Sequence, residues 1–229
     1  MHFGYFDPTH LVLILVSTAI GMATRGYISS TFKKWSAAPL ATGITGAEVA
    51  RRVLDSNGLF DVPVNAIPGH LADHYDPRSR TLALSASVYG QANVAAAGVA
   101  AHEAGHAIQH SSRYVLAGLR NALVPVANIG TRLAWILIMV GLFIRTSEVA
   151  WLGVLLFAGS VIFHIVTLPV EFNASRRALE ALKVSGAMSP EQVGGARQVL
   201  NAAALTYLGA ALISVMQLLY FAGFTRRRS

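Results

Sequence analysis

The sequence predicts a mainly α-helical integral membrane protein with about four transmembrane helices and a small unit at the membrane surface, in which one helix accompanies a short β-hairpin. Of the 229 residues, 54% are hydrophobic and only 13% are charged, a balance that is unusual for a soluble domain. Several apolar runs approach the roughly 20 residues that a helix needs to cross a bilayer. The net charge of +7 is scattered along the chain, which favours contact with anionic lipid head groups over nucleic acid.

The first apolar run covers residues 11–23 and can be extended through Tyr27 and Ile28, which predicts the first transmembrane helix. A cleaved signal peptide carries its positive charge before the apolar run. Here Arg25, Lys33 and Lys34 follow it. We therefore expect a retained anchor whose N-terminus lies outside the cell.

A soluble segment follows this anchor and begins with a helix signal. Thr45 and Glu48 have the spacing of a capping box, in which each side chain binds the other residue's backbone N–H. The segment should form a short amphipathic helix that ends near Asn57 and Gly58.

Two extended pieces come next, at residues 62–64 and 81–85, separated by the turn-rich segment 68–80. Their alternating pattern predicts a small β-hairpin, with Pro63 confining the first strand to an edge. We also expect residues 81–85 to expose an edge on which an extended substrate pairs as an additional strand. The residues expected to bind substrate there are Leu82, Ala83 and Leu84.

The remaining chain predicts one helix outside the membrane and three further spans. A helix at residues 93–111 begins with Asn93 as its N-cap and contains strong helix formers. Residues 123–144 and 149–168 are apolar, and the short link between them predicts a helical hairpin. Residues 202–224 form the fourth predicted span.

These predictions divide the chain into five parts, and charge suggests their orientation. The parts are an N-terminal anchor at 1–31, a surface unit with the helix at 93–111 at 32–121, a transmembrane hairpin at 122–168, a helical segment at 169–201, and a fourth transmembrane helix with a basic tail at 202–229. Most Lys and Arg flank the spans on the side of the helix at 93–111, which predicts that this side of a multi-pass cell-membrane protein is cytoplasmic. The arginines at 226–228 fall on the opposite side and argue against this orientation.

The helix at 93–111 carries the chemical motif of the chain, His102-Glu103-Ala104-Gly105-His106. Residues four apart share one helix face, so both imidazoles can bind one Zn²⁺, while Glu103 points at the open coordination position as a general base. The chain has no Cys, so any further ligand must be a His or a carboxylate. On its own, this five-residue pattern also occurs by chance.

A catalytic zinc needs a third protein ligand. His110 follows His106 by four residues, but a straight helix places it about 12 Å from His102. Glu171 is the better candidate, because two spans intervene and return the chain to the same side of the membrane. Ser175 lies one turn further on the same face, where it could bind the second nitrogen of a ligand histidine.

Three motifs together resemble a known family. Residues 102–110 (HEAGHAIQH), 69–85 (GHLADHYDPRSRTLALS) and 168–179 (LPVEFNASRRAL) look like those of the YugP-type membrane zinc metallopeptidases and, more distantly, of the HtpX-like gluzincins. The resemblance extends from about residue 27 to residue 224. It implies one catalytic Zn²⁺ on His102, His106 and Glu171, with Glu103 as the base that activates water for peptide-bond hydrolysis. HtpX-like enzymes usually have an Asp where Ser175 stands here.

Two other functions are compatible with the motif. An intramembrane protease of the site-2 type would place its third ligand, an Asp, within another span, and residues 123–168 contain no Asp. A non-catalytic zinc-binding scaffold would not need Glu103. We therefore expect an endopeptidase that acts on peptides or membrane proteins, with residues 32–121 as its zincin-like unit. A second metal site remains an alternative to ordinary turn chemistry for His70, Asp73, His74 and Asp76.

Overall fold

The computed structural model describes residues 8–226, and the remaining residues, including most of the basic tail, lie outside this range. The chain forms two compact units, each assembled from separate segments. Unit 1 comprises Met1–Arg25, Gly118–Leu168 and Thr206–Ser229, and unit 2 comprises Gly26–Ala117 and Pro169–Leu205.

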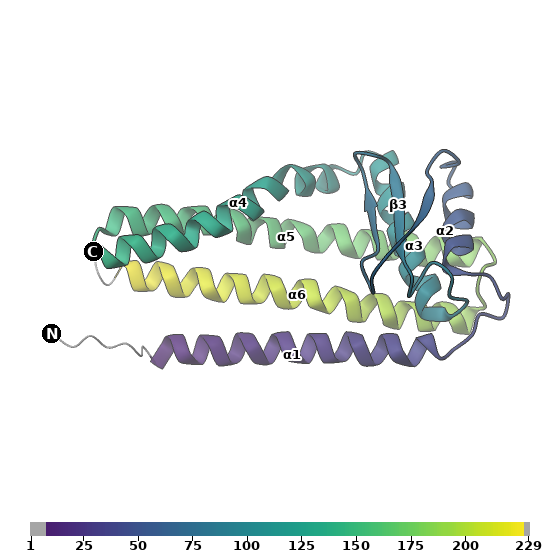
Figure 1. Ribbon diagram of the computed structural model, residues 1–229, viewed down its shortest axis with the longest axis horizontal. Coiled ribbons are helices and arrows are strands. Elements are labelled where there is room, and N and C mark those ends of the chain that lie inside the picture. Colours follow the sequence, from purple (N-terminus) through teal and green to yellow (C-terminus); the bar gives the residue numbers. More distant parts are fainter. Residues whose placement is uncertain (1–7, 227–229) are drawn as a thin grey trace. The chain divides into compact units, whose positions relative to one another are not determined.

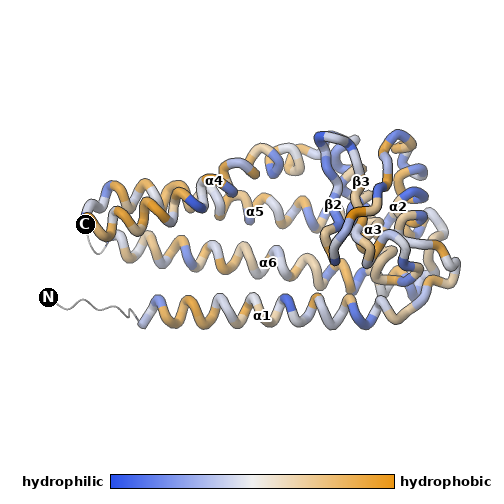
Figure 2. Tube along the Cα trace, in the orientation of Figure 1, coloured by the Kyte–Doolittle hydropathy of each residue, from blue (hydrophilic) through white to orange (hydrophobic). Residues whose placement is uncertain are grey.

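Helices dominate the described chain, as predicted (Figure 1). The elements in order are α1 (Pro8–Ser36), α2 (Gly46–Asp55), β1 (Val64–Ile67), β2 (His74–Asp76), β3 (Thr81–Ser85), α3 (Val94–Ser111), α4 (Val115–Phe143), α5 (Ser147–Val184) and α6 (Pro190–Arg226). Four of them, α1, α4, α5 and α6, are long and apolar enough to cross a membrane, which confirms the prediction of four helices of that length and character. Hydrophobic residues run along these helices, whereas hydrophilic residues gather on β2 and its flanking loops (Figure 2).

All four membrane-length helices are longer than the apolar runs that predicted them, and two of them also include a polar segment that was predicted separately. α5 continues through Pro169 to Val184, so the apolar run at 149–168 and the segment that carries Glu171 form one helix. Proline removes one backbone hydrogen bond from a helix interior, and α5 accommodates Pro169 without a break. α6 likewise begins at Pro190 and includes both the polar segment and the fourth apolar run.

Small residues allow close packing within unit 1. α4 and α5 are joined only by residues 144–146, which confirms the predicted helical hairpin. A Cβ atom on Gly153 would lie 2.8 Å from the carbonyl oxygen of Ala134, so the two backbones approach closely there. The hydroxyls of Thr131 and Ser160 are 2.6 Å apart and join the two helices through a hydrogen bond.

The sheet of unit 2 has three strands, and the predicted β-hairpin is wrong. The strand order is β1–β3–β2, with β1 parallel and β2 antiparallel to β3. The hairpin prediction failed because the turn-rich segment at 68–80 contains β2, which pairs with β3 in the position expected for the first strand. Pro63 precedes β1, and its carbonyl accepts a hydrogen bond of 2.9 Å from the Leu82 N–H.

β3 is therefore the central strand, which corrects the expectation of an exposed edge at residues 81–85. Both of its sides are hydrogen-bonded, to β1 and to β2. Leu82, Ala83 and Leu84 are 0%, 6% and 0% exposed, so no backbone edge is available there for a substrate strand. The edge strands are β1 and β2. A substrate strand therefore has no free edge at Leu82, Ala83 and Leu84, where its pairing was predicted.

The two predicted helix starts in unit 2 are confirmed. Thr45 and Glu48 form the complete capping box at the start of α2. The Asn93 side chain accepts a 2.9 Å hydrogen bond from the Ala96 N–H at the start of α3. Because each cap satisfies a backbone donor that the helix leaves free, both helices begin at a defined residue.

α3 packs closely against its neighbours because its buried residues are small. Its sequence is rich in Ala and Gly, and twelve of its residues are buried. A Cβ atom on Gly105 would lie 2.6 Å from the carbonyl oxygen of Ala174 in α5, and one on Gly98 would lie 3.3 Å from the Ala196 Cβ in α6. Gly105 therefore allows the face of α3 that carries His102 and His106 to lie directly against α5.

Candidate metal centre

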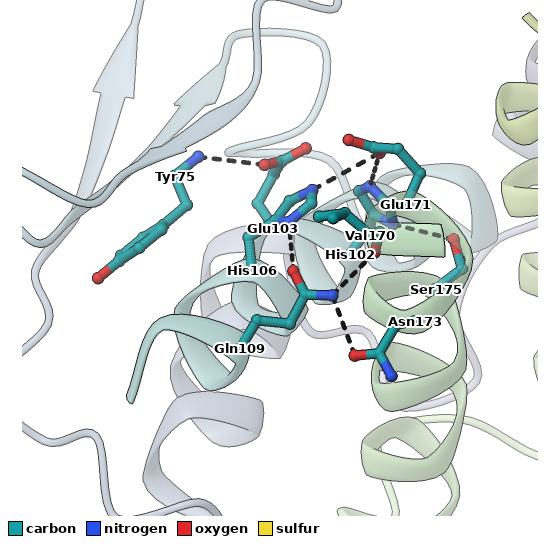
Figure 3. Close-up of polar contacts among 9 residues, drawn as sticks. All are labelled: Tyr75, His102, Glu103, His106, Gln109, Val170, Glu171, Asn173 and Ser175. Atoms are coloured by element: carbon teal, nitrogen blue, oxygen red, sulfur yellow. Dashed lines mark hydrogen bonds and ion pairs between the residues drawn. The ribbon is translucent and has the colours of Figure 1, made fainter. Parts of the chain in front are cut away.

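Two histidines of α3 and one glutamate of α5 converge in unit 2 (Figure 3). His102 Nε2 lies 3.2 Å and His106 Nε2 lies 3.6 Å from Glu171 Oε2. One ligand atom from each of the three residues lies within 4.8 Å of the other two. The Glu171 side chain is 2% exposed, and the two histidines are 12% and 16% exposed. The donor atoms thus face a common point that is largely shielded from solvent.

The spacing of these atoms fits a zinc ion. Ligand bonds of roughly 2.0 to 2.1 Å at tetrahedral angles place neighbouring donor atoms about 3.3 Å apart. The two separations of 3.2 and 3.6 Å are close to that value. Two imidazoles and one carboxylate are also the donor set of one class of catalytic zinc sites, which leave a fourth position for water.

The hydrogen bonds around the histidines orient their rings. Ser175 Oγ lies 3.1 Å from His102 Nδ1, and Gln109 Oε1 lies 3.0 Å from His106 Nδ1. The amide oxygen of Gln109 can only accept a hydrogen bond, so His106 Nδ1 carries the proton. In a neutral ring, Nε2 then has a free lone pair that faces Glu171, as metal coordination requires.

Gln109 connects α3 with α5, and the sequence analysis did not identify it. It is completely buried, and its Nε2 donates hydrogen bonds to the carbonyl of Val170 at 2.8 Å and to Asn173 Oδ1 at 3.0 Å (Figure 3). Val170 immediately precedes Glu171. The available signal for Gln109 in the sequence was its position three residues after His106, on the same face of the helix.

Glu103 lies beside the edge strand β2. Its Oε2 accepts a hydrogen bond of 3.1 Å from the backbone N–H of Tyr75 (Figure 3). Neighbouring residues of an antiparallel strand direct their N–H groups to opposite sides, so the Tyr75 N–H points away from β3. The outer edge of β2 therefore faces Glu103 of the motif.

Electrostatics in the pocket favour a charged His106. Its burial would lower its pKa, but the hydrogen bond to Glu171 and the negative charges of Glu103 and Glu171 outweigh burial and raise the pKa above the ordinary histidine value. In the absence of metal, two carboxylates therefore hold a proton on this ring. A bound cation would take over that role, because it would neutralise the same two carboxylates.

The other residues that the sequence singled out lie outside the triad. His110 is at the end of α3, and its Nδ1 lies 2.9 Å from the Tyr75 hydroxyl. Asp73 Oδ1 accepts a 2.7 Å hydrogen bond from the Ser85 N–H, and Asp76 Oδ1 accepts one from the Arg78 N–H. Asp76 thus stabilises a turn, whereas Asp73 joins the segment before β2 to the end of β3. Within residues 8–226, the triad is the only group of three His, Asp or Glu side chains whose ligand atoms lie close enough together to hold a metal ion.

The chain is similar to known proteins over almost its whole length. Residues 10–226 match the family described as "Putative neutral zinc metallopeptidase". The chain is 42% identical over 213 residues to the "Putative membrane protease YugP" of Bacillus subtilis (strain 168), an alignment that covers 92% of this chain and 95% of that protein. No solved structure gives a significant match.

Proposed function

The chain belongs to the neutral zinc metallopeptidase family that it matches, and on this premise we propose that it is a membrane-embedded, zinc-dependent endopeptidase. The observation that carries the proposal is the convergence of His102, His106 and Glu171 from two helices, with Glu103 adjacent. The ligand set of two His and one Glu corresponds to that of the gluzincins. We further propose that unit 2 is zincin-like and acts on the cytoplasmic side.

His102, His106 and Glu171 would hold the metal, and Glu103 would act on water. When bound, zinc would polarise the scissile carbonyl and make a water molecule more acidic. Glu103 accepts a proton from the attacking water and delivers it to the leaving amine. Ser175 and Gln109 keep the two imidazoles in the required orientation through their Nδ1 atoms.

The outer edge of β2 is the proposed binding surface for the peptide backbone. The N–H of Tyr75 points out from that edge, and Glu103 accepts its hydrogen bond. A substrate that pairs with β2 as an additional strand would therefore lie next to the catalytic base. This pairing would also replace the bond between Tyr75 and Glu103, leaving the carboxylate available to water.

Two features favour this function over its alternatives. An intramembrane protease would carry its zinc motif on a spanning helix, but α3 is not among the four helices of the described chain that are long and apolar enough to cross a membrane. A zinc scaffold would have no use for Glu103, which lies beside an open strand edge and supplies none of the triad's donor atoms.

Metal dependence tests the proposal directly. The purified protein in detergent should bind one zinc per chain and cleave an unfolded polypeptide, and it should lose cleavage on chelation and regain it when zinc is added. Glu171→Ala should lose both zinc and cleavage. Glu191→Gln removes a carboxylate that is exposed at the start of α6 and should change neither. Full zinc occupancy in Glu171→Ala would show that this residue is not a ligand.

A backbone variant tests the role of the β2 edge. Tyr75→Pro removes the N–H that points outward and the side chain, whereas Tyr75→Ala removes only the side chain. We expect Tyr75→Pro to raise KM for a peptide substrate well above that of Tyr75→Ala, with the zinc content of both unchanged. Equal KM values in the two variants would exclude backbone pairing at this position.

A further inference from the structure

A groove between α5 and α6 in unit 2 shares only Ser175 with the residues of the metal centre. It has a volume of about 230 Å³ and is lined by Phe172, Ser175, Arg176, Leu179, Glu180, Lys183, Arg197 and Asn201. α5 ends at Val184 and α6 begins at Pro190, so the short link makes the two helices antiparallel neighbours. Ser175 and Leu179 form a buried floor, each 9% exposed.

The charges of this groove suit an anion. Arg176, Lys183 and Arg197 are exposed, and Glu180 is the only acidic residue among the lining residues. Three positive charges and one negative charge give a net charge of +2. Within residues 8–226, none of these three cations forms an ion pair. A phosphate group, which accepts charge-assisted hydrogen bonds from Arg and Lys, matches this arrangement.

The groove also lies next to the apolar part of both helices. The apolar run of α5 ends at residue 168, eight residues before Arg176, which corresponds to about 12 Å along the helix axis. The apolar run of α6 begins at residue 202, five residues after Arg197, or about 8 Å along the axis. Long arginine side chains can extend toward the head-group layer, which lies just outside the hydrocarbon core.

The apolar residues of the groove distinguish a lipid from a soluble anion. Phe172 is 51% exposed and lies at the end of the groove nearest to the apolar run of α5, where glycerol and the first acyl carbons of a lipid would contact it. Lys183 lies 15 residues past residue 168, about 22 Å along the axis. The two arginines should therefore contact the phosphate, while Lys183 contributes only through its more distant charge.

We propose that this groove binds the phosphate head group of an anionic phospholipid, with Arg176 and Arg197 on either side of the phosphate. The site is separate from the triad and does not require zinc. Its floor nevertheless includes Ser175, whose hydroxyl also binds His102. A lipid bound there would contact the residue that orients a zinc ligand.

Lipid titration followed by native mass spectrometry tests the proposal. The full-length protein, in a neutral detergent, is titrated with phosphatidylglycerol or with phosphatidylcholine. The wild type should prefer phosphatidylglycerol. Each basic residue near the lipid phosphate contributes about fivefold in affinity, so Arg176→Gln combined with Arg197→Gln should weaken phosphatidylglycerol binding by about 25-fold. Lys183→Gln should have a smaller effect, and Glu180→Gln should strengthen binding.

A matched control removes the same charge elsewhere. Arg52 and Arg113 are exposed residues of unit 2 outside the groove, and Arg52→Gln combined with Arg113→Gln should leave phosphatidylglycerol affinity within about twofold of the wild type. The proposal is overturned if this control loses as much affinity as the groove variant, or if the groove variant retains wild-type affinity. It is equally overturned if glycerol phosphate, which has no acyl chains, binds as tightly as the lipid. The same holds if the groove variant changes only the cleavage of acidic peptides and not the binding of lipid.

Discussion

Gly105 should control how closely the metal ligands of α3 and α5 approach each other. The substitution Gly105→Ala places a Cβ atom 2.6 Å from the carbonyl oxygen of Ala174, whereas comfortable carbon–oxygen contacts begin at about 3.3 Å. The helices must therefore separate locally by about 0.7 Å. Zinc–ligand distances tolerate deviations of only about 0.2 Å, so the shift is large enough to pull Glu171 away from the two histidines.

The effect on zinc should exceed the effect on stability. Overpacking costs about 1 to 3 kcal/mol, but replacing a helical Gly by Ala returns about 1 kcal/mol, so we expect a net loss of roughly 0 to 2 kcal/mol in the free energy of unfolding. Displaced ligands should lower zinc affinity by about 10- to 100-fold. Competition with a chromophoric chelator measures the affinity, and thermal unfolding of the metal-free protein measures the stability.

Gly194→Ala is the matched control for this prediction. Gly194 lies within α6 in the same unit, and a Cβ atom there would meet no atom within 4 Å. This substitution should raise stability by about 0.5 to 1 kcal/mol and leave zinc affinity unchanged. Wild-type zinc affinity in Gly105→Ala would refute the argument that close approach of α3 and α5 sets the ligand geometry.

Three further predictions concern the two residues that orient the ligands and the ligand His106. Gln109→Leu leaves the His106 Nδ1 and the Val170 carbonyl without their partner. It should lower the free energy of unfolding by about 1 to 3 kcal/mol and zinc affinity by at least tenfold. A wild-type zinc affinity in the chelator competition assay would contradict this role. Ser175→Ala removes the partner of His102 Nδ1 and should lower zinc affinity by about tenfold, with the same competition assay as the measurement and an unchanged affinity as the opposing result. Because the pKa of His106 is raised, zinc binding should weaken as pH falls through that pKa. The metal-free protein should lose stability as pH rises from about 6.5 through the same pKa. Calorimetry of zinc binding and of unfolding across pH measures both trends, and a trend of the opposite sign in either would contradict the prediction.

Local signals in the sequence predicted the helices and their caps well. Asn93 and the pair Thr45 and Glu48 are side chains that bind the backbone within a few residues, so their geometry depends on almost nothing else. Run length and hydropathy likewise indicated the four membrane-length helices, because each run depends only on its own residues.

The sheet was harder to predict because its pairing is non-local. β1 pairs with β3 in parallel, although β2 lies between them in the sequence. β2 has only three residues, His74–Asp76, and their polar side chains resemble those of a turn. No short-range pattern could indicate that this strand would form the edge beside Glu103.

The position of Glu171 beside the histidines is a tertiary fact, and the sequence could indicate it only through the count of intervening spans. Gln109 was missed for a related reason: its contacts to Val170 and Asn173 exist only once α3 and α5 are packed together. In both cases the residue type was visible in the sequence, but the partner was not.

The most direct test of the account is the turnover of zinc-loaded Glu103→Gln. This variant keeps all three proposed ligands and the shape of the side chain, but it cannot accept a proton from water. A general base contributes typically 10²- to 10⁴-fold, so cleavage of an unfolded polypeptide should fall by about that factor while one zinc per chain remains bound. Turnover close to that of the wild type at full zinc occupancy would contradict the proposed mechanism.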